Sequence, residues 1–173
     1  MAIPVSSSGQ GCGRVQACVR GWFEPLATKL ASQRVALAVF SGALLLTGIL
    51  EWSMGRSFLG PDGKFGLWQG NIWSSECSQR VADPYSFSHV AHGILFYAGL
   101  WLIGRRWPIR NRLIIATLIE AAWELLENSP VMIERYRQTT IALGYDGDSI
   151  LNSLSDVLMM AVGFFIAFGV RPW

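Results

Sequence analysis

Charged residues are scarce in this chain, since Asp, Glu, Lys and Arg make up only 15% of its 173 residues. A soluble domain usually carries about a quarter. The net charge is only +2, which excludes the strongly basic surface of a nucleic-acid-binding domain. We therefore expect a single domain, because the length allows no more, and no nucleic-acid partner.

Cysteine is also scarce, with three residues at Cys12, Cys18 and Cys77. This set is too small and too dispersed for a disulfide scaffold, and a structural zinc site needs four close ligands. Residues 1–13 are small and polar and lack the apolar stretch of a signal peptide. We therefore expect no signal peptide in this segment.

Apolar residues, by contrast, are abundant and gather into four stretches of about 17 residues, each long enough to cross about 30 Å of hydrocarbon. They cover residues 35–52, 87–104, 113–128 and 154–170. The third ends at Ser129-Pro130, because the residue before a proline resists the helical conformation. The sequence predicts an all-α fold, an integral membrane bundle of four transmembrane helices over residues 34–173.

Residues 1–33 are expected to form a separate cytoplasmic segment. From Arg14 onward its apolar residues recur at helical spacing, with basic residues between them. This pattern fits an amphipathic helix lying on the membrane surface. A partly ordered tail fits it equally well.

The basic residues predict the orientation of the bundle. Segment 1–34 and the short connection 105–112 each hold four Lys or Arg, and the connection holds no acid. The connections around 53–86 and 129–153 balance acids against bases. By the positive-inside rule, we predict a multi-pass protein of the bacterial inner membrane with a cytoplasmic N-terminus and a cytoplasmic C-terminus.

Seven ionisable residues lie in or beside the predicted spans, where a charge facing lipid costs roughly 2.5–3.5 kcal/mol. They are Glu51, His89, His92, Glu120, Glu124, Glu127 and Asp156. We expect them to face one another or a water-filled cavity. Counting about 1.5 Å of rise per residue from the cytoplasmic ends places all but Glu120 in one layer of the outer half of the membrane.

Imidazoles and carboxylates at the same depth in the membrane suit the binding of a divalent transition metal such as zinc. They also suit acid–base chemistry. We predict His89, His92 and Glu124 as metal ligands. His92, Glu124 and Asp156 are the predicted catalytic residues, with Glu127 as an alternate ligand or base. Structural alternatives stay open. Glu51 and Glu127 simply reach interfacial water, and His89 is an interfacial donor with no further role, or the whole set is a structural polar network.

The connection before the last stretch supplies the predicted substrate-binding residues. Arg135 and Arg137 suit a phosphate clamp, although two arginines flanking a tyrosine also suit a rim that anchors lipid headgroups. Asn152 enters the last stretch on the same stripe as Asp156.

Three segments carry a resemblance to a known family: PYSFSHVAHGILFYAGL, EAAWELLENSPVMIERYR and GDSILNSLSDVLMMAVGF. They resemble a family of uncharacterised multi-pass inner-membrane proteins of alphaproteobacteria, from Val35 to the C-terminus. The resemblance implies a location but no activity.

The order of features is also distantly similar to VanZ-like membrane proteins. In those a histidine opens one span, a glutamate closes the next, and an arginine and an Asp/Asn pair precede the last. The residues that fill these places are His89 or His92, Glu124 or Glu127, Arg137, and Asp148 with Asn152.

Three functions remain open at this level. The first is a metal-dependent or acid–base enzyme acting in the bilayer on a lipid or lipid-linked substrate with an anionic headgroup. The second is a component of a proton or ion pathway, which would need Glu120. The third is a non-catalytic accessory subunit of a larger membrane complex.

Overall fold

The computed structural model describes residues 33–139 and 145–170, and in these ranges the chain is helical throughout its regular structure. The helices are α2 (Gln33–Ser53), α3 (Ser86–Ile103), α4 (Ile109–Glu127), α5 (Pro130–Thr139) and α6 (Ile150–Gly169). The prediction of an all-α fold is confirmed. The expected amphipathic helix before residue 33 lies outside the described residues.

Three of these helices, α2, α3 and α6, are long and apolar enough to cross a membrane, which indicates that the protein associates with membranes. The fourth predicted span coincides with α4, a helix of 19 residues. Two arginines and three glutamates lie within α4, so its composition does not match that of a membrane span. Four transmembrane helices are therefore not confirmed by length and composition.

Helix α2 places polar side chains inside and most of its apolar side chains outside. On α2 the buried residues are Ala43, Thr47 and Glu51, a stripe at four-residue spacing. Leu45 and Ile49 on its other face are exposed. Soluble proteins show the reverse distribution of charged and apolar side chains.

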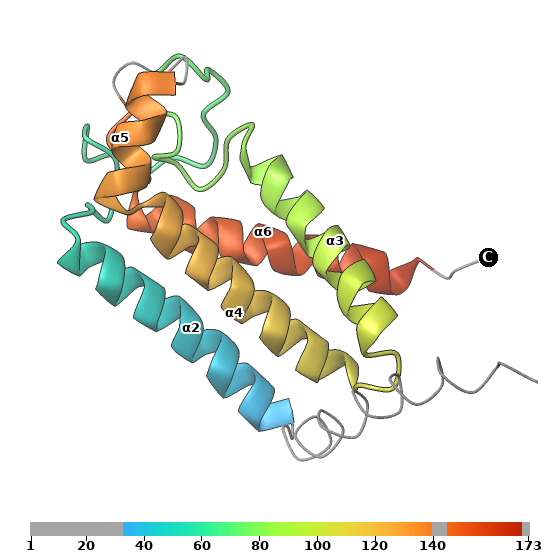
Figure 1. Ribbon diagram of the computed structural model, residues 1–173. Coiled ribbons are helices and arrows are strands. Elements are labelled where there is room, and N and C mark those ends of the chain that lie inside the picture. The colour runs from blue at the N-terminus through green and yellow to red at the C-terminus, as the bar shows by residue number, and fades with distance from the viewer. Residues whose placement is uncertain (1–32, 140–144, 171–173) are drawn as a thin grey trace, which may run out of the picture.

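The closest helix contact is the oblique crossing of α3 and α6 (Figure 1). It depends on two glycines, Gly93 and Gly163. A Cβ atom on Gly93 would overlap the carbonyl oxygen of Met160, and one on Gly163 would overlap that of Val90. Small residues allow this backbone approach, and it brings the histidine-bearing turn of α3 against α6.

Loop 54–85, α5 and the segment before α6 gather at one end of the bundle (Figure 1). The loop is internally ordered by an ion pair of 2.7 Å between Arg80 and Asp62. It is tied to α6 because the backbone N–H of Ser149 donates to the carbonyl of Ser78 at 3.0 Å. This end of the molecule covers the polar side chains described below.

The connection between the third and fourth predicted stretches contains a further helix, α5, over Pro130–Thr139. The proline that ends α4 also begins α5. Proline is favoured in the first turn of a helix, where its missing N–H leaves no hydrogen bond unmade.

Candidate functional site

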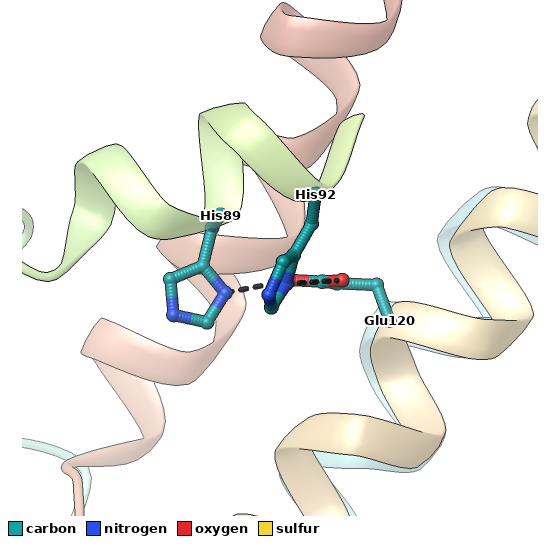
Figure 2. A group of neighbouring side chains, drawn as sticks. All are labelled: His89, His92 and Glu120. Carbon is teal, nitrogen blue, oxygen red and sulfur yellow. Dashed lines mark hydrogen bonds and ion pairs between the residues drawn. The ribbon is translucent and has the colours of Figure 1, made fainter. Parts of the chain in front are cut away.

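The centre of the polar cluster is the carboxylate of Glu120 on α4, which lies against two histidines of α3 (Figure 2). Its Oε1 lies 2.6 Å from Nδ1 of His89. Nδ1 of His92 lies 3.2 Å from both carboxylate oxygens. The two histidines are three residues apart and so share one face of α3.

These three residues form the candidate metal site of the described chain. One ligand atom from each lies within 4.8 Å of the other two. Glu120 and His89 are buried, while the His92 side chain is 30% exposed. Two imidazole nitrogens and one carboxylate are a ligand set that catalytic zinc sites use, with a further position left for water or substrate.

Two more carboxylates surround His89. Oε1 of Glu124 lies 3.3 Å from its Nδ1, and Oδ2 of Asp156 lies 3.7 Å from its Nε2. Within the described residues neither oxygen of Glu124, nor Oδ1 of Asp156, has a hydrogen-bond partner. His89 is thus in contact with acids from two helices. Oxygen atoms of these acids remain available to bind a metal ion or another ligand.

A cavity of about 260 Å³ reaches this cluster. Side chains of α3, α4, α5 and α6 line it, together with the loop that precedes α3. Among the predicted site residues, His89, His92, Glu127, Asn152 and Asp156 lie on its wall. Asp148 lines it as well, so a ligand in this space would meet both histidines and three carboxylates.

A second polar network borders the same cavity, around Asn128 at the end of α4. Its side-chain amide donates to Asp148 and Ser153, each at 3.1 Å. Its Oδ1 accepts the backbone N–H of Asp148 at 2.7 Å. The hydroxyl of Tyr145 donates to the other oxygen of Asp148 at 2.7 Å. This network fixes the segment that leads into α6.

Burial and neighbouring groups raise the pKa values of Asp148 and Tyr145. Burial, followed by the negative charge of Glu127, raises the pKa of Asp148 to about 7. Burial and the neighbouring Asp148 also raise the pKa of Tyr145. In Tyr136 of α5, burial and Glu127 raise the pKa to about 12. The Asp148 carboxyl therefore titrates near neutral pH, whereas both phenols stay protonated there.

Glu51 is the remaining buried acid of the seven ionisable residues predicted from the sequence. Its side chain is 0% exposed, and neither oxygen has a hydrogen-bond partner among the described residues. The interpretation that it reaches interfacial water is therefore wrong. Glu51 lies on α2 and does not line the cavity.

The predicted substrate-binding arginines lie outside the cavity wall. Arg137 forms an ion pair with Asp146 and donates to the carbonyl of Tyr145 at 2.8 Å, so it holds the segment before α6. Arg135 is exposed on α5. Asn152 does line the cavity, and its amide donates to the carbonyl of Arg80 at 2.9 Å.

Sequence reasoning placed Glu120 apart from the other polar residues, yet it contacts both histidines. Its position four residues before Glu124 places both glutamates on one face of α4, and this spacing could have predicted that Glu120 belongs to the cluster. Tyr136, Tyr145 and Trp123, which also line the cavity, carried no comparable signal, because an aromatic residue beside a membrane is ordinarily an interfacial anchor.

Comparisons with known proteins place these residues in a family. The family model described as "Protein of unknown function (DUF2585)" matches residues 51–173. A UPF0314 protein of Paracoccus denitrificans is 49% identical over 79% of this chain and 70% of its own length. One of Agrobacterium fabrum is 49% identical over 78% and 68%, and one of Sphingopyxis alaskensis is 48% identical over 75% and 68%.

These matches confirm the resemblance to an uncharacterised alphaproteobacterial family. No solved structure matches the chain. The distant similarity to VanZ-like proteins stays a prediction.

Proposed function

Because the chain belongs to the DUF2585 family, whose description names no activity, we propose a function from the geometry of the site. The protein is a four-span protein of the bacterial inner membrane that binds a divalent transition metal through His89, His92 and Glu120. The metal and the neighbouring carboxylates act on a lipid or lipid-linked substrate in the outer half of the bilayer. One observation carries the proposal: three buried or half-buried ligands from two helices converge within 4.8 Å.

The exposed surface of α4 supports a fourth span. Glu120 and Glu124 are buried, and so is Arg112, whose guanidinium lies over the ring of Tyr97. Beyond the first turn, its exposed residues are Leu118, Ile119, Ala122, Trp123 and Leu126. A helix that presents only such a face to lipid does not expose its charges to hydrocarbon.

The direction of the helices supports cytoplasmic termini. Along the chain α2, α3, α4 and α6 alternate in direction (Figure 1). The α3–α4 connection lies at the opposite end from α5 and carries the exposed Arg105 and Arg106. Basic connections stay in the cytoplasm, so the ordered loop 54–85 and α5 lie on the periplasmic side, over the cavity.

Acid–base groups are available beside the proposed metal. Asp156 and Glu127 line the cavity, and Glu124 lies behind His89 at 3.3 Å. A metal-bound water has a lowered pKa and becomes a nucleophile near neutral pH. A cavity carboxylate within reach of that water would accept its proton, which fits a hydrolytic reaction.

Metal content tests the proposal. Elemental analysis of the detergent-purified protein is expected to find about one divalent transition-metal ion, such as zinc, per chain. His92→Ala and Glu120→Gln each remove a ligand and should reduce the metal content to background. Glu134→Gln removes an exposed carboxylate of α5 and serves as the matched control, with unchanged content. Metal-free protein that also takes up no zinc or manganese on titration contradicts the proposal.

A proton pathway is the second candidate function, and the buried acids favour it. Glu51 and Glu124 are fully buried without hydrogen bonds in the described chain, an arrangement more typical of proton carriers than of structural groups. Proteoliposomes that conduct protons in the absence of metal, and lose conduction in Glu124→Gln, would favour this function. Stable co-purification with a larger complex would favour an accessory role instead.

A further inference from the structure

The cavity wall carries a pronounced charge bias. Among the described residues that line it are three carboxylates, Glu127, Asp148 and Asp156, and two histidines, but no lysine or arginine. An anionic group entering this space would meet carboxylates and find no fixed cation on the wall. The wall therefore disfavours the anionic headgroup that the arginines of α5 suggested.

Aromatic rings also line the cavity. Tyr136 and Tyr145 meet edge to face, with ring centroids 5.9 Å apart and planes at 63°. The Tyr145 ring is held in place by the 2.7 Å hydrogen bond from its hydroxyl to Asp148. Tyr85 and Trp123 complete the aromatic lining. Aromatic faces combined with carboxylates recognise ammonium groups, including quaternary ones.

One carboxylate oxygen on this wall lacks a partner. Asp156 is 3% exposed, and its Oδ1 makes no hydrogen bond to any described residue. A buried carboxylate oxygen is stabilised by a donor or a cation, and leaving it without one is unfavourable. An N–H donor or a positive charge in the cavity would provide this oxygen with a hydrogen bond or an ion pair.

We propose that this cavity binds a small organic ammonium group, carried by a lipid headgroup or by a free amine, beside the His89–His92–Glu120 cluster. The volume of about 260 Å³ lies just below the usual range for ligand pockets and suits a headgroup rather than a large ligand. The inference rests on the proposed function in one respect, since it treats the cavity as the place where the substrate meets the metal.

The test uses the full chain in detergent after treatment with a chelator, so that metal plays no part. Binding of choline and ethanolamine is measured by calorimetry, beside 3,3-dimethylbutanol, the uncharged isostere of choline, and inorganic phosphate. The two ammonium compounds should bind at least about tenfold more tightly than the isostere, and phosphate should not bind. Equal affinity for choline and its isostere, or binding of phosphate alone, would overturn the inference.

Variants place the binding in this cavity. Glu127→Gln and Asp156→Asn should each weaken choline binding about tenfold or more. Glu127 is only half-buried, so its variant keeps the inference testable even if Asp156→Asn misfolds. Glu134→Gln, on the exposed face of α5, is the matched control and should bind as the wild type does. Unchanged choline binding in Glu127→Gln would contradict the site.

An experiment with lipids shows whether the ammonium group comes from a lipid headgroup or from a free amine. Native mass spectrometry of protein exchanged into mixed phosphatidylethanolamine and phosphatidylglycerol would show selective retention of the former if the source is a lipid, and no selection if it is a free amine. Selective retention of phosphatidylglycerol would contradict the inference. Metal content of the same preparations separates the claims: metal without ammonium binding overturns only this inference, and ammonium binding without metal overturns only the metal proposal.

Discussion

His89 shows how the acids and bases of this bundle are matched at the scale of single residues. Its Nδ1 lies 2.6 Å from Glu120 and its Nε2 lies 3.7 Å from Asp156, so one imidazole contacts acids on two other helices. Glu124 stands beside this arrangement with no hydrogen bond of its own in the described chain. A network selected only for stability would leave fewer buried carboxylate oxygens without partners.

Substitutions at the site test this distinction. His92→Ala, Glu124→Gln and Asp156→Asn should melt within a few degrees of the wild type in detergent but fail in bound metal or in complementation of a deletion strain. The two carboxylate changes also remove a buried negative charge, which favours insertion into the membrane. In a purely structural network each change would strand a partner and cost about 1–3 kcal/mol. Variants that melt early yet still complement would show that the cluster is structural.

The pH dependence of stability should report the Asp148 carboxyl. Folding raises its pKa from 3.8 to about 7, so the folded state binds this proton more tightly than the unfolded chain. Its contribution to stability is therefore fully present below about pH 4 and is lost as the pH rises through about 7. The Asp148→Asn variant has no carboxyl to titrate at this position. The melting temperature of the variant minus that of the wild type should therefore increase as the pH is raised from about 4 to 7. Parallel melting curves for the two proteins across this range would contradict the assigned pKa.

At the scale of elements, the α3–α6 crossing positions the site. Gly93 lies one residue after His92, and the backbone of Met160 on α6 occupies the space that a side chain at Gly93 would need. The histidines therefore reach α4 and α6 only while the two helix backbones remain in close contact.

Two alanine substitutions on α3 test this dependence. Gly93→Ala forces the backbones apart and should destabilise the protein by about 1–3 kcal/mol, with loss of metal. Gly99→Ala is the matched control, because a Cβ atom there meets nothing within 4 Å, and alanine is the better helix former. Its melting temperature should match or exceed that of the wild type. Equal melting of both variants would mean that the crossing is looser than described.

Helices α2, α3 and α6 could be predicted from sequence, because each is a long apolar segment bounded by polar residues. The bounds of α3 lie within one residue of the predicted 87–104. Two features could not be predicted. Helix α5 contains few apolar residues and begins at a proline, so no periodic pattern revealed it. The depth of Glu120 is the second, because a count of rise along the helix ignores helix tilt and begins at Arg112, the last basic residue of the short connection, which is buried in the bundle.

At the scale of the whole molecule, apolar side chains face outward over every long helix, while Glu51, His89, Glu120, Glu124 and Asp156 lie inside. In water this arrangement would expose far more contiguous apolar surface than soluble monomers do. In a bilayer it is the expected one, and the ordered loops then close one end of the bundle.

Reporter fusions test this placement. Fusions after Pro108 and after Trp173 should report the cytoplasm, and fusions after Gly70 and after Gly144 should report the periplasm. The reason is the excess of Lys and Arg in segment 1–34 and connection 105–112 over the other two connections, because basic segments stay in the cytoplasm. A cytoplasmic signal from the fusion after Gly70 would place the cavity at the wrong face of the membrane and contradict the orientation.

The most direct test of the metal site is the X-ray absorption spectrum of the purified protein loaded with one equivalent of zinc. Coordination by His89, His92 and Glu120 predicts nitrogen and oxygen neighbours at about 2.0–2.2 Å, with the scattering pattern of two imidazole rings. The Glu120→Gln protein should lose this spectrum, and the Glu134→Gln protein should retain it. Sulfur neighbours at about 2.3 Å, or a spectrum of hydrated zinc unchanged by Glu120→Gln, would contradict the assignment.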